Sequence, residues 1–473
     1  MIDLRLSLTL FLIIFLEGYV VLSSELLAIR QVIPYAGSGT DTVSIIIAAV
    51  LMPLAFGYQA GGQFIQGWDG EKYVSIRKKL IFNLIVSQSI LLFGLSYFVI
   101  DIFFTELFRS GITNRILQVT IYSLVFIVSP VYLLGQTIPL ISNYFSKEQL
   151  SKITGKILFF STLGSFMGAV FSTLVLMAIF GVHHTVSINF IILASLITLL
   201  NKDKQSRTVL LSWAITIFAM LMNSNIMMNS MGIVNNNQYN TVQIHHTENE
   251  RHLFLNRNYS SMMDNDGNVH PYIAFMDQKA IMPIWKSAEK RNILILGAGG
   301  FTIGAPDKNN HYDFVDIDPD LKDIAETYIL EGRLSKNKHF HPIPARAFLN
   351  KTDLLYDLII LDAYHGAANL PEHLATKEFF EHVKEKLKPG GVVMANFIAS
   401  PTFGNDFSRN IHTTFTEVFP YSDREILGEY NLWSDNKSNT VNAVYTYKHN
   451  ENEKTKKIYT DNHNTIYLDI PKQ

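Results

Sequence analysis

The sequence predicts a multi-pass α-helical membrane domain followed by a small β domain and a doubly wound α/β domain of the Rossmann type. Three observations support this fold class. Apolar stretches of about 20 residues, long enough to cross a bilayer, follow one another up to residue 230. Residues 239–256 alternate polar and apolar side chains around a turn, which is typical of a β-hairpin. From residue 291, continuous Ile/Leu/Val strands alternate with glycine turns and helices, as in a parallel sheet covered by helices.

The first half of the chain contains about seven candidate spans. They lie near residues 7–29, 43–65, 80–104, 116–141, 156–180, 184–200 and 208–229. Lys and Arg gather in alternate connections, so the positive-inside rule predicts that these loops and the N-terminus face the cytoplasm. Seven full crossings would then place the second half outside. Because the last stretch ends in Ser, Asn and Met, we expect it to lie along the membrane or to re-enter it. The soluble half is then cytoplasmic, on the cell (inner) membrane.

These patterns predict four segments: a multi-pass domain at 1–230, a β domain at 235–285, a catalytic domain at 290–448 and a polar tail at 449–473. The net charge of −2, without a basic stripe, argues against nucleic acid as a partner. The absence of cysteine excludes disulfides, thiolate catalysis and Cys-based zinc sites. The histidines lack the spacing of metal ligands, so no metal is expected.

Two acidic residues, Glu17 and Glu25, interrupt the first apolar stretch. Ionisable groups inside a span are costly and indicate a function by default. Eight residues apart on a helix, they lie within roughly 80° of each other, so one face can present both. They form either part of a path for cations or an internal pair within the bundle, and the sequence leaves both interpretations open.

The stretch "RNILILGAGGFTIG" reads as a buried strand that runs into a glycine turn. Gly297 begins a turn at which the backbone can approach a ligand closely. Asp316 ends the next strand, where an acidic side chain can accept hydrogen bonds from ribose hydroxyls; the alternative is that it caps the following helix. The short connection between Gly300 and Tyr312 leaves no room for a full crossover helix. A dinucleotide is therefore disfavoured, and an S-adenosyl compound, which carries no phosphate, fits better.

Asp362 follows the strand "YDLIIL" at the open edge of the predicted sheet, in the crevice where such folds place their ligands. A partly shielded carboxylate there can hold a cationic amine and accept its proton. The alternative is an aspartate that merely begins a turn.

Together these motifs resemble the spermidine synthase (polyamine aminopropyltransferase) family, and more closely its membrane-fused branch. The resemblance rests on "SELLAIRQVIPYAG", "LAFGYQAGGQF" and "GKILFFSTLGSFMGAVFSTLVL" in the spans, and on "YNTVQI", "GAGGFT", "VDIDPD", "ARAFL" and "DAYHGAANLP" in the soluble half. It implies a class I S-adenosylmethionine-dependent methyltransferase-like fold. It also implies transfer of an aminopropyl group from decarboxylated S-adenosylmethionine to a polyamine such as putrescine, and a homodimer.

The resemblance assigns roles to thirteen positions. Asp362 matches the catalytic aspartate. The cofactor-binding positions are Gly297, Gly299, Gly300, Asp316, Ala345 and Arg346. The substrate-binding positions are Tyr239, Asn240, His270, Tyr272, Tyr364 and His365.

Three positions depart from the family pattern, because Gly300, Pro344 and His365 stand where the family has acidic residues. The loss of three carboxylates weakens the expectation of a doubly charged amine substrate. Two alternatives therefore stay open. One is an S-adenosylmethionine-dependent methyltransferase on the same fold. The other is a transporter or sensor that binds a polyamine or nucleoside without turnover. In every case the expected partners are the lipid bilayer and a small molecule.

Overall fold

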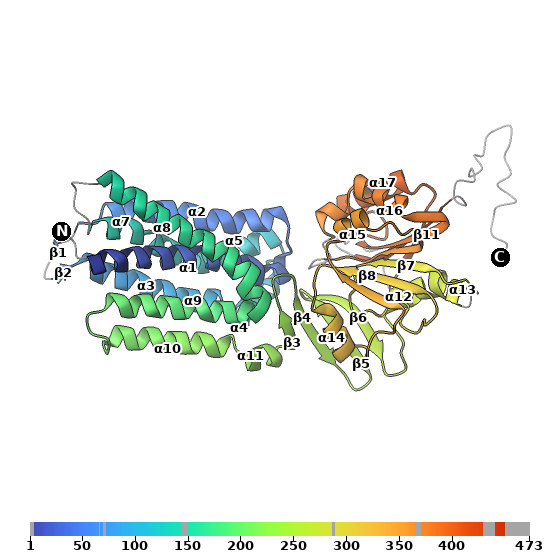
Figure 1. Cartoon of the computed structure of the whole chain (residues 1–473), viewed down its shortest axis with the longest axis horizontal. Coiled ribbons are helices and arrows are strands. Elements are labelled where there is room, and N and C mark those ends of the chain that lie inside the picture. Colours follow the sequence, from blue (N-terminus) through green and yellow to red (C-terminus); the bar gives the residue numbers. More distant parts are fainter. Residues whose placement is uncertain are drawn as a thin grey trace. The chain divides into compact units, whose positions relative to one another are not determined.

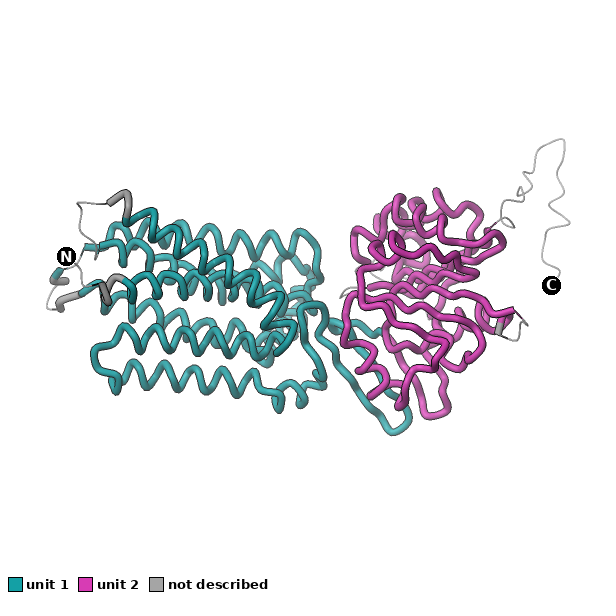
Figure 2. The backbone as a smooth tube through the Cα atoms, viewed as in Figure 1, with its two compact units in different colours: residues 1–260, 365–369 teal, residues 261–364, 370–473 magenta. Residues whose placement is uncertain are grey.

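The computed structural model describes residues 4–65, 67–69, 72–143, 150–285, 289–364, 370–428 and 440–449. The chain divides into two compact units, coloured separately in Figure 2. We call residues 1–260 with 365–369 the helical unit, and residues 261–364 with 370–473 the αβ unit. The predicted polar tail lies outside the described residues from position 450 onward. The predicted boundaries at 230, 235–285 and 290 remain predictions. The division into two compact units does not coincide with them, because the helical unit also includes strands that follow its last helix.

The helical unit is built from apolar helices and one small hairpin (Figure 1). The helices are α1 (Leu4–Ala36), α2 (Thr40–Gly62), α3 (Ile76–Gly94), α4 (Tyr97–Arg109), α5 (Arg115–Phe126), α6 (Val128–Gly135), α7 (Thr137–Ser142), α8 (Leu150–Phe171), the π-helix η2 (Ser172–Met177), α9 (Ala178–Leu200), α10 (Arg207–Met222) and α11 (Asn225–Ser230). The hairpin pairs β1 (Gly67–Asp69) with β2 (Lys72–Val74).

Three helical stretches among the described residues are long and apolar enough to cross a membrane: Leu8–Ala36, Thr40–Gly62 and Ile153–Leu200. Two bent pairs, α3 with α4 and α5 with α6 and α7, raise the number to five if each pair is one span. The stretch 153–200 covers two of the spans expected from the sequence, and it breaks at Gly181, whose φ is +82°. The last expected span is represented by α10, which has 16 residues.

Helix α1 packs backbone to backbone against α8. An added Cβ at Gly164 would lie 2.0 Å from the carbonyl oxygen of Phe15, and one at Gly168 would lie 2.3 Å from that of Tyr19. Only glycine permits this approach, which is the usual basis of tight helix association in membranes. Gly164 and Gly168, which lie four residues apart on one face of α8, therefore hold α1 against α8.

A four-stranded antiparallel sheet follows the helices, in the order β3 (Ile233–Asn236), β4 (Thr241–His246), β5 (Glu250–Leu255) and β6 (Asn258–Asp264). Strands β4 and β5 form the hairpin expected at 239–256. Arg30 of α1 is buried and donates hydrogen bonds to the carbonyl oxygen of Asn237 (2.8 Å) and to the side chains of Thr241 and Asn256. A charged side chain at the end of α1 therefore fastens this hairpin to the helices.

The αβ unit contains a seven-stranded sheet in the order β12-β13-β11-β10-β7-β8-β9. Its strands are β7 (Asn292–Leu296), β8 (His311–Asp316), β9 (Lys338–Pro342), β10 (Tyr356–Leu361), β11 (Leu387–Ala399), β12 (Asp423–Leu427) and β13 (Val441–Lys448). Strands β7 to β11 are parallel, and β13 runs antiparallel between β11 and β12. The strand order reverses between β7 and β10, which creates the crevice where open α/β sheets bind ligands. The predicted doubly wound, methyltransferase-like fold is confirmed.

Helices cover both faces of this sheet. Figure 1 shows α15 (Ala345–Lys351), α16 (Lys377–Glu385) and α17 (Asp406–Val418) grouped on one face, and α12 (Pro271–Met276) with α14 (Leu321–Tyr328) on the other. The aromatic rings of Phe380, Phe397 and Phe415 pack edge to face at centroid distances of 5.3–6.3 Å. This buried cluster fixes the helical layer against β11.

The connection from β7 to β8 is too short for a full crossover helix, which leaves room for a short or irregular one; the structure has no helix there. The carboxylate of Asp307 stabilises this connection, because it accepts hydrogen bonds from the side chains of Asn310 (2.6 Å) and Tyr312 (2.7 Å). The buried Lys338 donates to the carbonyl oxygens of Ala305 and Asp307. Burial lowers the pKa of Lys338 to about 8. A compact polar core thus replaces the missing crossover helix.

Candidate functional site

The candidate site lies at the carboxyl ends of β7 and β10. These strands are parallel neighbours whose last residues, Leu296 and Leu361, are paired. The backbone N–H of Asp362 donates to the carbonyl oxygen of Leu296 (2.9 Å). The glycine turn and the predicted catalytic aspartate, 65 positions apart in the sequence, therefore begin side by side in the crevice where the strand order reverses.

Gly297 is required by this close approach. Its φ is +100°, a conformation that L side chains rarely adopt, and an added Cβ would lie 2.3 Å from the carbonyl oxygen of Asp362. Gly299 also has a positive φ, of +48°. The turn therefore exposes backbone rather than side chains at the edge of the sheet, as expected of a turn that approaches a ligand.

Gly300 ends the glycine turn, and Ser261 of β6 occupies the space beside it. The backbone N–H of Gly300 donates to Oγ of Ser261 (2.9 Å), and an added Cβ at Gly300 would lie 2.8 Å from Cβ of Ser261. Ser261 is buried. A side chain at position 300 is thus excluded by a residue that no local sequence pattern singles out.

The carboxylate of Asp362 accepts two hydrogen bonds from side chains of the αβ unit. The hydroxyl of Tyr272 donates to Oδ2 (2.9 Å), and the Nδ2 of Asn396 donates to Oδ1 (3.0 Å). Burial raises the pKa of Asp362 to about 7, although both hydrogen bonds act to lower it. A carboxyl group that titrates near neutral pH can take up and release a proton under physiological conditions, which a normal aspartate cannot.

Asp316 ends β8 and holds the glycine turn from the other side. Its Oδ2 accepts from the backbone N–H of Ala298 (3.0 Å), and its Oδ1 accepts from that of Asp318 (3.1 Å). Burial raises its pKa to about 6. Each carboxylate oxygen has a second lone pair, so binding of ribose hydroxyls is compatible with these contacts and remains a prediction.

Two other predicted residues, Tyr364 and His270, have defined places in the αβ unit. The hydroxyl of Tyr364 is tied to β11, because it donates to the carbonyl oxygen of Asn396 (2.7 Å) and accepts from the N–H of Ile398 (2.7 Å). His270 is the N-cap residue of α12, and its ring lies 4.9 Å from the ring of Tyr272. Burial lowers the pKa of His270.

Ala345 and Arg346 begin α15, directly after Pro344 at its N-cap. The guanidinium of Arg346 donates to the carbonyl oxygen of His373 (2.8 Å) and to Oγ1 of Thr376 (2.7 Å). It therefore fastens the segment before α16, and its predicted contact with a cofactor remains untested.

The remaining predicted residues do not belong to the described part of this unit. Tyr239 and Asn240 lie in the helical unit, where Oδ1 of Asn240 accepts from Nδ2 of Asn256 (2.9 Å). His365 lies outside the described residues. Among the residues that the structure describes, no group of three or more His, Cys, Asp or Glu side chains is arranged to hold a metal ion.

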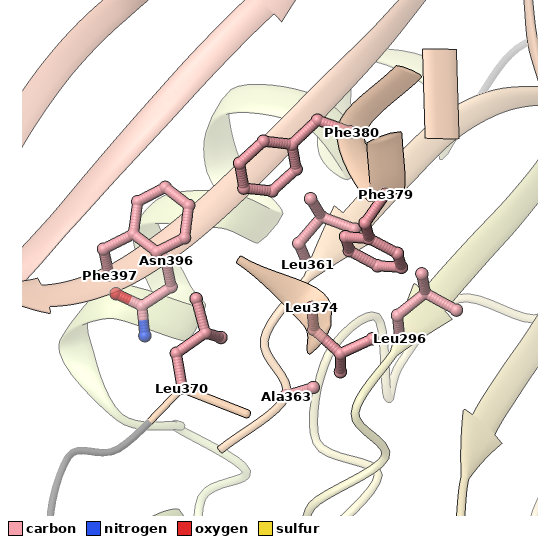
Figure 3. A pocket seen from close by; sticks show the side chains of 9 residues that line it. All are labelled: Leu296, Leu361, Ala363, Leu370, Leu374, Phe379, Phe380, Asn396 and Phe397. Carbon is pink, nitrogen blue, oxygen red and sulfur yellow. The ribbon is translucent and has the colours of Figure 1, made fainter. Parts of the chain in front are cut away.

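A small apolar cavity lies beside the carboxylate site (Figure 3). Its walls are Leu296, Leu361, Ala363, Leu370, Leu374, Phe379, Phe380, Asn396 and Phe397. Asn396 is the polar member of this lining and also donates to Asp362. Most of these side chains belong to the hydrophobic core of the sheet, so this cavity is a small packing gap beside the carboxylate.

Comparison with known proteins finds sequence similarity in this unit. Residues 275–427 match the family model of the spermine/spermidine synthase domain. A polyamine aminopropyltransferase of Vibrio vulnificus is 33% identical over 136 residues, which cover 27% of this chain and 45% of that protein. A polyamine aminopropyltransferase of Hyperthermus butylicus is 32% identical over 138 residues, with the same coverage. The chain thus spans less than half the length of these curated relatives.

Solved structures similar to the chain include a probable spermidine synthase from Corynebacterium glutamicum, with 18% identity and a TM-score of 0.39. That match covers 47% of this chain and 80% of the other. The spermidine synthase from Thermotoga maritima has 15% identity, a TM-score of 0.35 and coverage of 48% and 79%. Residues 275–427 thus match the spermine/spermidine synthase domain model, and the chain is similar in sequence to polyamine aminopropyltransferases.

Proposed function

We propose that this protein is a membrane-bound aminopropyltransferase that moves the aminopropyl group of decarboxylated S-adenosylmethionine to a polyamine such as putrescine. The observation that carries the proposal is the carboxylate of Asp362, held by Tyr272 and Asn396 in the crevice of a spermine/spermidine synthase domain. The pKa of this group, raised to about 7, fits a general base better than a normal aspartate does.

In the proposed reaction, a neutral amine nitrogen attacks the aminopropyl carbon that is bonded to the sulfonium. The new C–N bond forms as the C–S bond breaks, and the bonding electron pair stays on sulfur, which gives neutral methylthioadenosine. The amine proton passes to the carboxylate of Asp362. Alkyl amines have a pKa near that of lysine, about 10.4, so a base that titrates near 7 accepts this proton far more readily than one near 4.

The other residues of the site hold and align the reactants. Asp316 supports the glycine turn through the N–H of Ala298 and retains acceptor capacity for ribose hydroxyls. The positive φ of Gly297 keeps the turn free of side chains where the adenosyl group is expected. Alignment of two bound reactants supplies much of the rate enhancement in such a transfer.

The membrane location and orientation form part of the same proposal. The apolar helices α1, α2 and 153–200 support attachment to a bilayer, and the basic loops favour a cytoplasmic αβ unit on the inner membrane. A lipid bilayer, a small amine and a second copy of the chain are the proposed partners. A reporter fused to the C-terminus should be active only in the cytoplasm, and activity only outside would reverse the orientation.

Product analysis tests the chemistry. Full-length protein in lipid nanodiscs is incubated with decarboxylated S-adenosylmethionine and putrescine, and in parallel with S-adenosylmethionine. We expect release of methylthioadenosine, and its loss in the Asp362→Asn variant. Release of S-adenosylhomocysteine instead would indicate a methyltransferase, and the absence of both products, with ligand still bound, would indicate a binding protein.

A further inference from the structure

The inner face of α1 presents two buried carboxylates that no other group in the described protein neutralises. Glu17 is 2% exposed and Glu25 is 8% exposed. Within the described part of the chain, neither has a hydrogen bond or an ion pair. A buried carboxyl group needs a partner in either protonation state, as an acceptor when charged and as a donor when neutral. The described side chains of the bundle therefore provide neither carboxyl group with a partner.

The apolar stretches of the surrounding helices contain no Lys or Arg to balance these acids. Arg30, the nearest basic residue further along α1, is committed to the β4–β5 hairpin. Lys and Arg are absent from residues 6–29, 40–62, 80–108, 116–146 and 157–201. Charged groups inside a membrane domain are normally paired, so a cation from outside the chain would balance these acids in their ionised form.

Two buried amide oxygens beside α1, one from α9 and one from α1 itself, have no hydrogen-bond donor. Nδ2 of Asn189 in α9 donates to Oγ of Ser24 (3.4 Å), while its Oδ1 has no hydrogen-bond partner. Nε2 of Gln31 donates to the carbonyl oxygen of Leu95 (2.8 Å), while its Oε1 has none. Both residues are 1% exposed. At seven-residue spacing, Glu17, Ser24 and Gln31 share one face of α1. Unpaired acceptors thus accompany the two acids, and a ligand rich in N–H donors would satisfy them.

The helix packed against α1 is irregular at the same level. Ser172 begins the π-helix η2, and its hydroxyl bonds to the hydroxyls of Ser23 (2.8 Å) and Tyr19 (2.8 Å). Single π-turns inside α-helices occur frequently at functional sites. This irregularity lies opposite the stretch of α1 between the two glutamates.

We infer that the helical unit binds an aliphatic polyamine along α1, with ammonium groups at Glu17 and Glu25 and further N–H donors at Asn189 and Gln31. Eight residues of helix separate the two carboxylates by roughly 12 Å along the axis. One metal ion needs its ligands within about 2.6 Å, so it cannot bridge them, whereas a chain with separated ammonium groups can. The choice of a polyamine rests on the proposed function; the existence of the site does not.

Equilibrium dialysis with radiolabelled spermidine tests this inference. The full-length Asp362→Asn variant is used, in nanodiscs of neutral phosphatidylcholine, so that neither the catalytic carboxylate nor anionic lipid contributes. We expect saturable binding that weakens roughly tenfold or more in Glu17→Gln and in Glu25→Gln, because each loses a charge-assisted hydrogen bond. Glu106→Gln is the matched control, since Glu106 is an exposed glutamate of the same unit that pairs with Arg109.

Unchanged spermidine binding in the Glu17→Gln/Glu25→Gln double variant would overturn the inference, as would Mg²⁺ that competes as well as putrescine. A second measurement covers the case in which the variants misfold. In the unsubstituted protein, spermidine should protect Glu17 and Glu25 from modification by a carbodiimide, and equal modification with and without spermidine would refute the site. Because binding is measured without turnover, a failure of aminopropyl transfer would leave this result intact.

Discussion

Replacing Tyr272 with phenylalanine removes one of the two hydrogen bonds that stabilise the carboxylate of Asp362. The hydroxyl of Tyr272 donates to Oδ2 at 2.9 Å, and the ring itself packs at the start of α12. Phenylalanine keeps the ring, so the change acts mainly on the carboxylate. A hydrogen bond to a charged group contributes about 1.5–3 kcal/mol, and part of it is retained when the carboxyl is protonated. With 1.36 kcal/mol per pKa unit, we expect the pKa of Asp362 to rise by about one unit.

The sign of this shift determines the pH dependence. The proposed base is active when ionised, so kcat/KM should rise with pH through the pKa of Asp362, which is about 7 in the unsubstituted protein. Without the Tyr272 hydroxyl, the ionised form is less stable, and the rising limb should move to about pH 8. The assay is release of methylthioadenosine between pH 5.5 and 9.5, at subsaturating amine.

Two outcomes would refute this reasoning. A rising limb that stays near pH 7 in Tyr272→Phe would show that the hydroxyl does not stabilise the ionised carboxylate. A limb that moves to lower pH would show that Asp362 is not the group that titrates. Tyr421→Phe is the matched control, because Tyr421 is an exposed tyrosine of the same unit and its substitution should leave the profile unchanged.

Three further substitutions test the architecture. Gly297→Ala should lower the free energy of unfolding by at least about 1–2 kcal/mol, because position 297 has a positive φ, and calorimetry should detect no adenosyl binding. Gly332→Ala, whose added Cβ has no close neighbour, should leave binding intact. Asp307→Ala should destabilise the β7–β8 connection by about 3 kcal/mol, seen as faster hydrogen exchange in residues 301–310; unchanged exchange there would contradict its assigned role. Arg30→Met should speed exchange across residues 233–255 by removing a buried donor, while Arg109→Gln, an exposed ion pair, should not; equal effects of the two would rule out a special role for Arg30.

Local patterns in the sequence predicted the position of the site. A strand followed by glycine, and a neighbouring parallel strand followed by aspartate, must end at the same edge of a sheet. That is why Gly297 and Asp362 were identifiable as neighbours. The short connection after the glycine turn likewise excluded a full crossover helix, although it did not predict that the connection contains no helix at all. These inferences need only strand order and chain length.

The partners of the site residues could not be predicted in the same way. Asn396 supports Asp362 from within β11, and its signal was a single amide in the apolar run "VVMANFI". Ser261 fills the space beside Gly300 from a strand some 40 residues earlier, which no local pattern reveals. Arg346 was predicted to bind a cofactor from its motif, but the motif does not show that His373 and Thr376 accept from its guanidinium.

The helices show the same limit. Hydropathy located the apolar stretches, but it did not show the bends after Gly94 and Phe126, the π-helix at 172–177 or the break at Gly181. The sequence showed Glu17 and Glu25 as unusual. Only the fold shows that both are buried and that no basic side chain reaches them in the described structure.

Binding of decarboxylated S-adenosylmethionine to the full-length protein tests the central claim most directly. Titration calorimetry in nanodiscs should give binding to the unsubstituted chain, at least about tenfold weaker binding to Asp316→Asn, and no change for the exposed Glu331→Gln. No detectable binding, or equal binding to Asp316→Asn, would contradict the assignment of the crevice between Gly297, Asp316 and Asp362 as an adenosyl site.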